Sequence, residues 1–256
     1  MVNNICDLSI YFLFFLINMQ YENQVATTNN IVLIHSYYYE KKEIRRQELE
    51  TTLSININNS YIDKIHLLIE SKQLKLFDNY DFLPIQSNKI ILVPVMEQPT
   101  YKKLFQYGNE IMKNNTNMII VIQNSDIVCT DSIRYAVCIK ENEIFALSRY
   151  ERPCGSTEFP ALQCNQYQDS HDLFIFKNQI PEVITNELKF TQNHWGAENL
   201  VIYQLKKNGF NVVNPCYTIQ CVHNHCSNQK HTPEQRIDNP ETHGTSKPTY
   251  IDCFFD

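Results

Sequence analysis

The chain has 256 residues, of which 43% are hydrophobic, so it is long and apolar enough to fold around a sizeable core. Its formal net charge is −6 and its lysines and arginines are scattered, which argues against a protein that binds nucleic acid by neutralising phosphates. Only 5 glycines are present, and none stands in a GxGxxG or GxxxxGKS/T loop, so dinucleotide-binding Rossmann enzymes and P-loop enzymes are poor candidates.

The first 29 residues are predicted to be a hydrophobic leader followed by a polar linker. Residues 8–19 (LSIYFLFFLINM) are apolar but too few to span a bilayer, and Asp7 stands where a signal peptide usually carries basic residues. Three interpretations stay open: a signal peptide, a short membrane anchor, or an extension upstream of a true start at Met19. The first places the protein in the secretory pathway and the third in the cytoplasm. Membrane association is expected only if residues 8–19 act as an anchor.

Strands and helices alternate through the first half of the chain. Short apolar runs rich in β-branched residues predict strands over residues 30–36, 65–69, 89–95, 117–122 and 144–147. Helices are predicted over residues 40–57, 100–112 and 130–138. Strands that are apolar throughout are buried on both faces, so this order predicts an α/β fold with a Rossmann-like, mostly parallel sheet and helices on both faces. Pro94 indicates that the end of the third strand lies at a sheet edge or where the chain leaves the sheet.

The second half of the chain changes character. Residues 150–167 are predicted to form a loop, and a strand over residues 173–176 and a helix over residues 197–207 follow. Beyond residue 231 the chain is polar and without periodicity, which predicts a loosely packed tail. The predicted organisation is therefore a leader with its linker (1–29), one domain (30–230) and a polar tail (231–256).

Nine cysteines are an odd number, and they are not arranged as in a small disulfide-bonded scaffold. Cys129 and Cys138 fall in or next to apolar runs and are predicted to be buried thiols. Six others lie in loop-like sequence and can pair if the chain enters an oxidising compartment. These six are Cys154, Cys164, Cys216, Cys221, Cys226 and Cys253. The sequence leaves their pairing open.

A short polar segment, Asn124, Ser125 and Asp126, follows the most clearly predicted strand. In open α/β sheets a ligand binds outside the carboxyl ends of the strands. A carboxylate at that place can hold a divalent cation, which in turn holds a diphosphate. The alternative is structural, an Asx turn that caps the helix beginning near Thr130.

Further short segments stand at the ends of predicted elements: 45–49 (RRQEL), 99–101 (PTY), 146–149 (ALSR), 169–172 (DSHD), 195–199 (WGAEN), 214–216 (NPC) and 223–227 (HNHCS). Together with 124–127 (NSDI), and in this order, they resemble the motifs of a family of GT-A-fold glycosyltransferase-like proteins of algae, protists, bacteria and large DNA viruses. The resemblance covers roughly residues 30–230. Residues 195–199 are also similar to the W-G-G-E-D element of β-galactosyltransferases.

The resemblance implies a GT-A fold and an enzyme that transfers a sugar from a nucleotide-diphosphate sugar to a glycan or glycoconjugate acceptor. Inversion is expected because Glu198 matches a position used as a base, and a retaining reaction stays open. Asp126 would bind a divalent metal ion together with His223 or His225, and an imidazole ligand favours Mn²⁺ over Mg²⁺. That ion would neutralise the departing diphosphate as a Lewis acid. The donor-site residues implied by the resemblance are His35, Ser36, Tyr37, Arg45, Asn124 and Arg149.

These donor-site residues have different expected roles. His35, Ser36 and Tyr37 follow the first strand, where a GT-A fold binds the base and ribose of the nucleotide. Asn124 replaces the first acid of a DxD-like motif, and Arg149 would contact the diphosphate or the donor sugar.

Inverting transfer also needs a general base to take the proton of the acceptor hydroxyl. Glu198 is the first candidate because it opens the last helix, and Asp172 is the second; Asp169 is expected to bind a sugar hydroxyl. A helix start lowers the pKa of a carboxyl group, which predicts that Glu198 is ionised. The structural alternatives are a helix-capping carboxylate for Glu198 and a turn residue for Asp172.

Three positions depart from the family pattern: Gln98 and Leu200 replace an arginine, and Glu198 replaces an aspartate. A non-catalytic relative that binds nucleotide sugars or carbohydrates therefore stays open as an alternative function. A Mg²⁺-dependent nucleotidyltransferase is disfavoured because no glycine-rich loop follows the first strand. A structural zinc site around His223 and His225 is disfavoured as well, since the nearby C-x4-C-x4-C spacing does not match C-x2-C knuckles.

Overall fold

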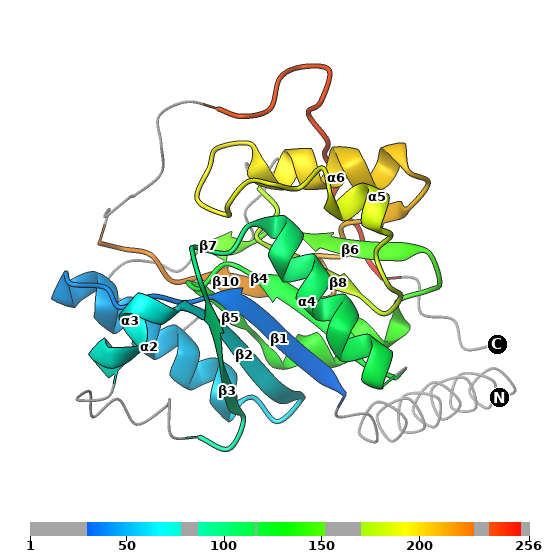
Figure 1. The fold of residues 1–256 in the computed structure, drawn as a ribbon. Coiled ribbons are helices and arrows are strands. Elements are labelled where there is room, and N and C mark those ends of the chain that lie inside the picture. The colour runs from blue at the N-terminus through cyan, green and yellow to red at the C-terminus, as the bar shows by residue number, and fades with distance from the viewer. Residues whose placement is uncertain (1–29, 78–86, 116, 152–169, 228–235, 252–256) are drawn as a thin grey trace, which may run out of the picture.

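The computed structural model describes residues 30–77, 87–115, 117–151, 170–227 and 236–251. Their centre is a seven-stranded sheet with the strand order β3-β2-β1-β4-β8-β6-β9 (Figure 1). Its strands are β1 (Ile31–Ser36), β2 (Ile62–Glu70), β3 (Ile90–Val95), β4 (Ile119–Gln123), β6 (Glu143–Leu147), β8 (Leu173–Phe176) and β9 (Asn211–Val213). β8 runs antiparallel to β4 and β6, whereas the other pairings in this sheet are parallel.

Helices cover both faces of this sheet, as the sequence predicts. One apolar cluster joins the sheet to α2 (Glu43–Asn58), α3 (Ser71–Phe77) and the 3-10 helix η2 (Asp131–Cys138). A second cluster joins the opposite face to α4 (Tyr101–Asn114), α5 (Glu182–Thr185) and α6 (Ala197–Lys207). In β1, Leu33 belongs to the first cluster and Ile34 to the second, because successive side chains of a strand point to opposite faces. The predicted α/β class, with a mostly parallel sheet, is confirmed.

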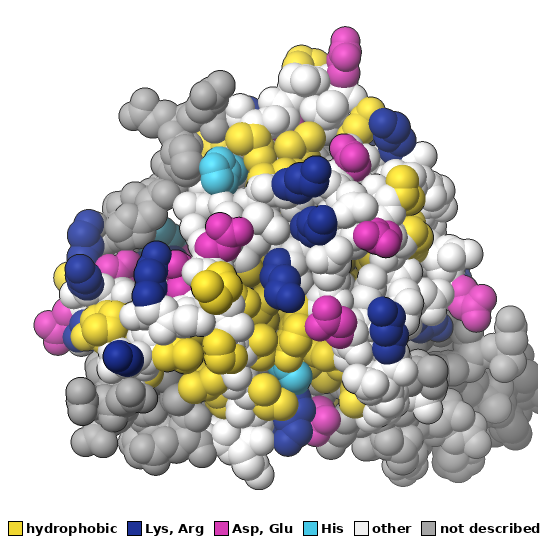
Figure 2. Space-filling model, viewed as in Figure 1, with side chains coloured by type: hydrophobic (Ala, Val, Ile, Leu, Met, Phe, Trp, Pro, Cys, Tyr) yellow, Lys and Arg dark blue, Asp and Glu magenta, His cyan; other side chains and the backbone are white. Residues whose placement is uncertain are grey.

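The predicted sheet edge is also confirmed, since β3 is the outermost strand and carries Pro94. Ile91 and Leu92 of this strand are 38% and 37% exposed. Figure 2 shows apolar side chains gathered at the surface in this region, beside α4. Because successive strand residues point to opposite faces, the β3 edge of the sheet is left partly open on both faces.

Three short strands that the sequence did not reveal form a second sheet, in the order β5-β10-β7. They are β5 (Ile127–Cys129), β7 (Tyr150–Glu151) and β10 (Cys221–His223). β7 lies at the start of the predicted loop over residues 150–167. Strands of two or three residues carry no periodicity, so only their long-range pairing defines them.

The described part of the polar tail, residues 236–251, is packed against the domain, which corrects the expected loose tail. Gly244 and Asn199 of α6 exchange two hydrogen bonds, one between backbone atoms and one from the Asn199 side chain. The Gly244 backbone passes so close to α6 that an added Cβ would lie 2.3 Å from the backbone nitrogen of Tyr203. Ser246 is buried, and its hydroxyl donates to the carbonyl of Val212 in β9.

The cysteines within the described ranges are of two kinds. Cys129, Cys216 and Cys221 are free and buried, and burial raises the pKa of the Cys129 thiol to about 12, as in an unreactive thiol. Cys138 and Cys226 each take part in a disulfide. The expectation of a buried free thiol is therefore confirmed for Cys129 and wrong for Cys138.

Two expectations concern segments that the structure does not describe. No helix in the described ranges is long and apolar enough to cross a membrane. The apolar stretch 8–19 and Asp169 both lie outside those ranges.

Candidate active site

The second sheet brings distant polar residues together next to the end of β4. Asp126 lies between β4 and β5. On β10, His223 is paired with Ile127 of β5 on one side and with Glu151 of β7 on the other. The ladder therefore places Asp126, His223 and Glu151 next to one another, although His223 lies 97 residues beyond Asp126 in the sequence.

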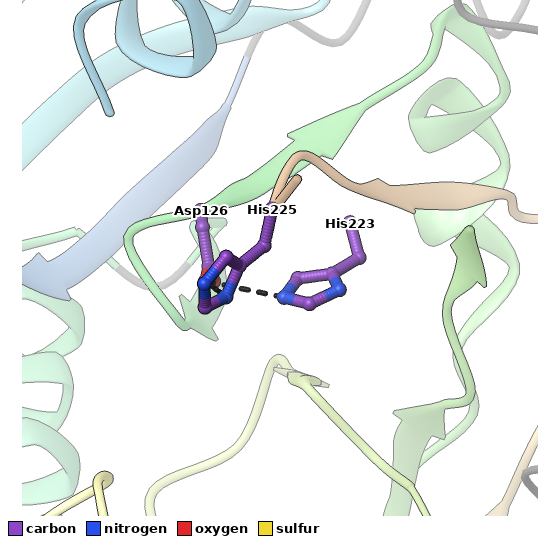
Figure 3. Close-up of side chains that lie close together, drawn as sticks. All are labelled: Asp126, His223 and His225. Carbon is purple, nitrogen blue, oxygen red and sulfur yellow. Dashed lines mark hydrogen bonds and ion pairs between the residues drawn. The ribbon is translucent and has the colours of Figure 1, made fainter. Parts of the chain in front are cut away.

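Asp126, His223 and His225 form a compact group (Figure 3). One ligand atom from each residue lies within 4.8 Å of the others. The Asp126 Oδ2 atom is 3.2 Å from Nε2 of His223 and 3.7 Å from Nδ1 of His225. The Nε2 atom of His225 is buried and has no hydrogen-bond partner within the described residues. Because a buried polar atom normally has a partner, a group with one carboxylate, two imidazoles and a free nitrogen is suited to a divalent metal ion.

Helix α2 holds this group from the other side through Arg45 and Glu48, which are one helical turn apart. Arg45 donates to Asp126 Oδ2 at 2.6 Å and to Glu48 Oε2 at 2.9 Å. The Glu48 carboxylate also accepts from the backbone amides of Cys226 and Ser227, at 2.8 and 2.7 Å. One turn of α2 thus fixes both the carboxylate of the group and the segment that carries its histidines.

The charges in this group stabilise one another. Burial alone would raise the pKa of the Asp126 carboxyl, but the positive charges of His223 and Arg45 hold it well below its usual range. Burial alone would lower the pKa of His223, but its contacts with Asp126 and Glu151 raise it to about 9. Without a metal ion, His223 is therefore an imidazolium between two carboxylates at neutral pH.

Of the three residues predicted to bind the nucleotide, two are buried at the end of β1. His35 is 1% exposed, and its Nε2 atom has no hydrogen-bond partner among the described residues. Burial lowers the pKa of His35 to about 4, although the nearby charge of Asp126 opposes this shift, so the ring is neutral. Tyr37 is 4% exposed and packs against His35 and Phe77, which makes it a core residue. Ser36 is partly exposed.

Arg149 links the metal-binding group to a second set of polar residues. Its Nε atom donates to Glu151 at 2.7 Å, and its Nη1 atom donates to both Asp172 oxygens at 3.0 and 3.2 Å. Asp172 also accepts from Asn124 and from the Ser170 hydroxyl. These donors engage both oxygens of the Asp172 carboxylate.

Glu198 lies in the first turn of α6, as predicted, but its ionisation differs from the expectation. Burial, followed by the negative charge of Asp172, raises the pKa of Glu198 to about 8, against an opposing hydrogen bond from Asn124. A helix N-terminus stabilises a carboxylate by about 0.3–1 kcal/mol, which lowers its pKa by less than one unit. Burial can raise the pKa of a carboxyl group by up to about 3–5 units. The larger effect wins, so Glu198 is mostly protonated at neutral pH. The Tyr101 hydroxyl donates to Glu198 Oε1 at 3.4 Å.

The structure thus brings together most of the predicted site residues and adds two that were missed. Glu48 lies within the RRQEL segment, which was matched as a motif without a role for this residue. Glu151 had no signal in the sequence, because it follows the ALSR segment in a stretch predicted to be a loop. Its contact with His223 depends on the pairing of β7 with β10.

Comparisons with known proteins give likenesses of fold only. No protein-family model matches the sequence, and no curated protein matches it. Among solved structures, the mannosyltransferase PcManGT from Pyrobaculum calidifontis, in complex with GDP-Man and Mn²⁺, is similar with a TM-score of 0.46 and 13% identity over 79% of this chain. The match spans 59% of that protein.

Two further solved structures are similar at the same level. For the 4-diphosphocytidyl-2C-methyl-D-erythritol synthase from Anaerococcus prevotii, the TM-score is 0.47 and the identity 13%, over 80% of this chain and 93% of that one. For the glycosyltransferase GlyE from Streptococcus pneumoniae, the TM-score is 0.44 and the identity 15%, over 80% of this chain and 56% of that one. Likeness at this level does not carry function, which depends on the residues of the site.

Proposed function

We propose that this chain is a metal-dependent glycosyltransferase of the GT-A type, which moves a sugar from a nucleotide-diphosphate sugar to a glycan or glycoconjugate acceptor with inversion. The observation that carries the proposal is the convergence of Asp126, His223 and His225 beyond the end of β4. This is where open α/β sheets bind their ligands. The order of the sequence motifs supports the same reaction class.

The residues present fit a divalent metal ion. Two imidazoles and one carboxylate favour Mn²⁺ over Mg²⁺, which prefers oxygen ligands and keeps several waters. When bound, the ion neutralises charge on the departing diphosphate as a Lewis acid. The protein prepares this site through Arg45, which orients the Asp126 carboxylate, and through Glu48, which holds the backbone just beyond His225.

The other residues of the site prepare the acceptor side of the reaction. Arg149 binds Asp172, and the negative charge of Asp172 raises the pKa of Glu198. A carboxyl group with a pKa near 8 is a stronger base, once ionised, than an ordinary glutamate. Glu198 therefore takes the acceptor proton best in mildly alkaline solution, and the fraction of enzyme with Glu198 ionised limits turnover at lower pH.

The test uses the purified full-length chain and a panel of nucleotide sugars with Mn²⁺, Mg²⁺ or EDTA. We expect nucleotide-sugar binding that requires metal and is lost in Asp126→Asn, and turnover that is lost in Glu198→Gln while binding remains. Asp131→Asn, which removes an exposed carboxylate, serves as the matched control. Absence of metal-dependent binding for every nucleotide sugar would overturn the proposal.

The alternative is a non-catalytic relative that binds the same donors or a carbohydrate. The state of the two candidate bases favours it, because Asp172 is engaged by Arg149 and Glu198 is protonated at neutral pH. Binding without turnover from about pH 6 to about pH 9, with all acceptors tested, would establish this alternative.

A location in the secretory pathway stays a prediction. Disulfides persist in oxidising compartments such as the secretory pathway. The location is therefore tested by measuring whether Cys138 and Cys226 are oxidised in protein from its native source.

A further inference from the structure

Glu151 is held beside His223 by the backbone. β7 and β10 pair in parallel with Glu151 directly opposite His223, and Tyr150 opposite Val222. On its other side β10 pairs with β5, which follows Asp126. His223 thus lies between two carboxylates. The β7–β10 register places Glu151 opposite His223, and Asp126 directly precedes Ile127, the partner of His223 in β5.

The contacts of His223 separate the roles of its two nitrogens. The Nδ1 atom is 2.9 Å from Glu151 Oε2, and the Nε2 atom is 3.2 Å from Asp126 Oδ2. A ring nitrogen that donates its hydrogen to a carboxylate cannot bind a metal ion, so the contact with Glu151 leaves Nε2 as the ligand atom. That atom faces Asp126 and His225.

Both oxygens of Glu151 are engaged, which fixes the carboxylate as well as the imidazole. Oε1 accepts from Arg149 Nε at 2.7 Å, and Arg149 in turn binds Asp172. The Glu151 side chain is 34% exposed and lies outside the compact group of metal-binding atoms that the described residues form. Glu151 therefore touches a ligand residue without belonging to the ligand set.

We propose that Glu151 is a positioning residue for the metal ion: it orients the His223 ring and selects the tautomer in which Nε2 binds the metal. This inference rests on the proposed function, since it assigns a partner to one of the proposed metal ligands. The competing interpretation is a surface ion pair that contributes only to stability. Outer partners of histidine ligands typically change metal affinity by about 10–100-fold when they are removed, whereas a surface ion pair leaves affinity unchanged.

The experiment measures Mn²⁺ affinity from the electron paramagnetic resonance signal of free Mn²⁺, without substrate, in the full-length chain. Glu151→Ala is expected to weaken binding by about 10–100-fold. Glu151→Gln keeps an oxygen that can accept from Nδ1, so a smaller loss is expected. Glu141→Ala, at an exposed position of similar chemistry, is the control and leaves the affinity unchanged.

A double-mutant comparison separates positioning from stability. In a His223→Ala background, Glu151→Ala is expected to cause no further loss of Mn²⁺ affinity, because its effect passes through that ring. Thermal unfolding of each variant shows whether the fold is intact.

The outcomes distinguish this inference from the proposed function. If the wild-type chain does not bind Mn²⁺, the role of Glu151 falls, and the proposed function is decided by metal-dependent binding of nucleotide sugars. If the wild type binds and a folded Glu151→Ala variant binds equally well, only the role of Glu151 is overturned. The same holds if Glu151→Ala weakens binding equally with and without His223.

Discussion

Replacing Glu198 with glutamine removes a carboxyl group that the folded protein holds in its protonated form. Burial and the charge of Asp172 raise the pKa of Glu198 from 4.5 to about 8. Between these pH values the folded state binds one more proton than the unfolded state, so this group lowers the free energy of unfolding progressively as the pH rises. Glutamine has a similar shape and does not ionise. We therefore expect Glu198→Gln to be more stable than the wild type at alkaline pH and less different from it near pH 5.

The size of the effect follows from the same shift. One proton difference changes the free energy of unfolding by about 1.4 kcal/mol per pH unit. From about pH 5 to about pH 8 the upper limit is about 4 kcal/mol. Because Glu198 keeps partial contact with solvent, we expect the advantage of Glu198→Gln to grow by about 1–3 kcal/mol over this range.

Urea unfolding of both proteins at several pH values, with disulfides intact, measures this difference. Glu141→Gln removes an exposed carboxyl group and controls for the change in net charge. A difference between Glu198→Gln and wild type that stays constant from about pH 5 to about pH 8 would refute the reasoning. It would mean that Glu198 is ionised throughout and that the helix terminus outweighs burial.

Turnover of the wild-type enzyme is expected to rise with pH, with its midpoint at about pH 8, where half of Glu198 is ionised. A pH–rate profile of kcat checks this, and a flat profile would exclude Glu198 as the base. Gly196→Ala should lower the thermal stability more than Gly209→Ala. Both glycines have a positive φ, 84° and 88°, which strains any other residue. Only at Gly196 would an added Cβ also lie 1.8 Å from an oxygen of Asp238. Equal losses would show that Asp238 moves away freely. The Asn214 side chain is 0% exposed and makes three hydrogen bonds. Asn214→Ala should therefore lower the free energy of unfolding by about 1–3 kcal/mol for each buried partner left unpaired. A loss near zero in urea unfolding would contradict this.

Local sequence was sufficient for the main elements of this fold. The apolar runs of β1, β4 and β8 can only be strands buried on both faces, and the predicted bounds of α6 agree with the structure. Pro94 indicated an edge strand because it cannot donate a hydrogen bond to a neighbour. The motifs at the ends of these elements also placed Asp126 and the histidines in one site.

What the sequence could not decide depends on contacts between distant segments. β5, β7 and β10 are stable only because they pair with one another, so neither they nor the Glu151–His223 contact has a local signal. The polar tail lacks periodicity, yet it packs through backbone hydrogen bonds to α6 and β9.

The ionisation of Glu198 also could not be predicted from the local sequence. Its place at a helix start can be read locally and predicts a lowered pKa. Its burial beside Asp172, which raises the pKa, exists only once α6 has packed on the face of the sheet. The sequence by itself therefore determined the main elements and most residues of the candidate site. The tertiary structure decided the short strands, the partners and the charges, because burial and long-range pairing are properties of the assembled fold.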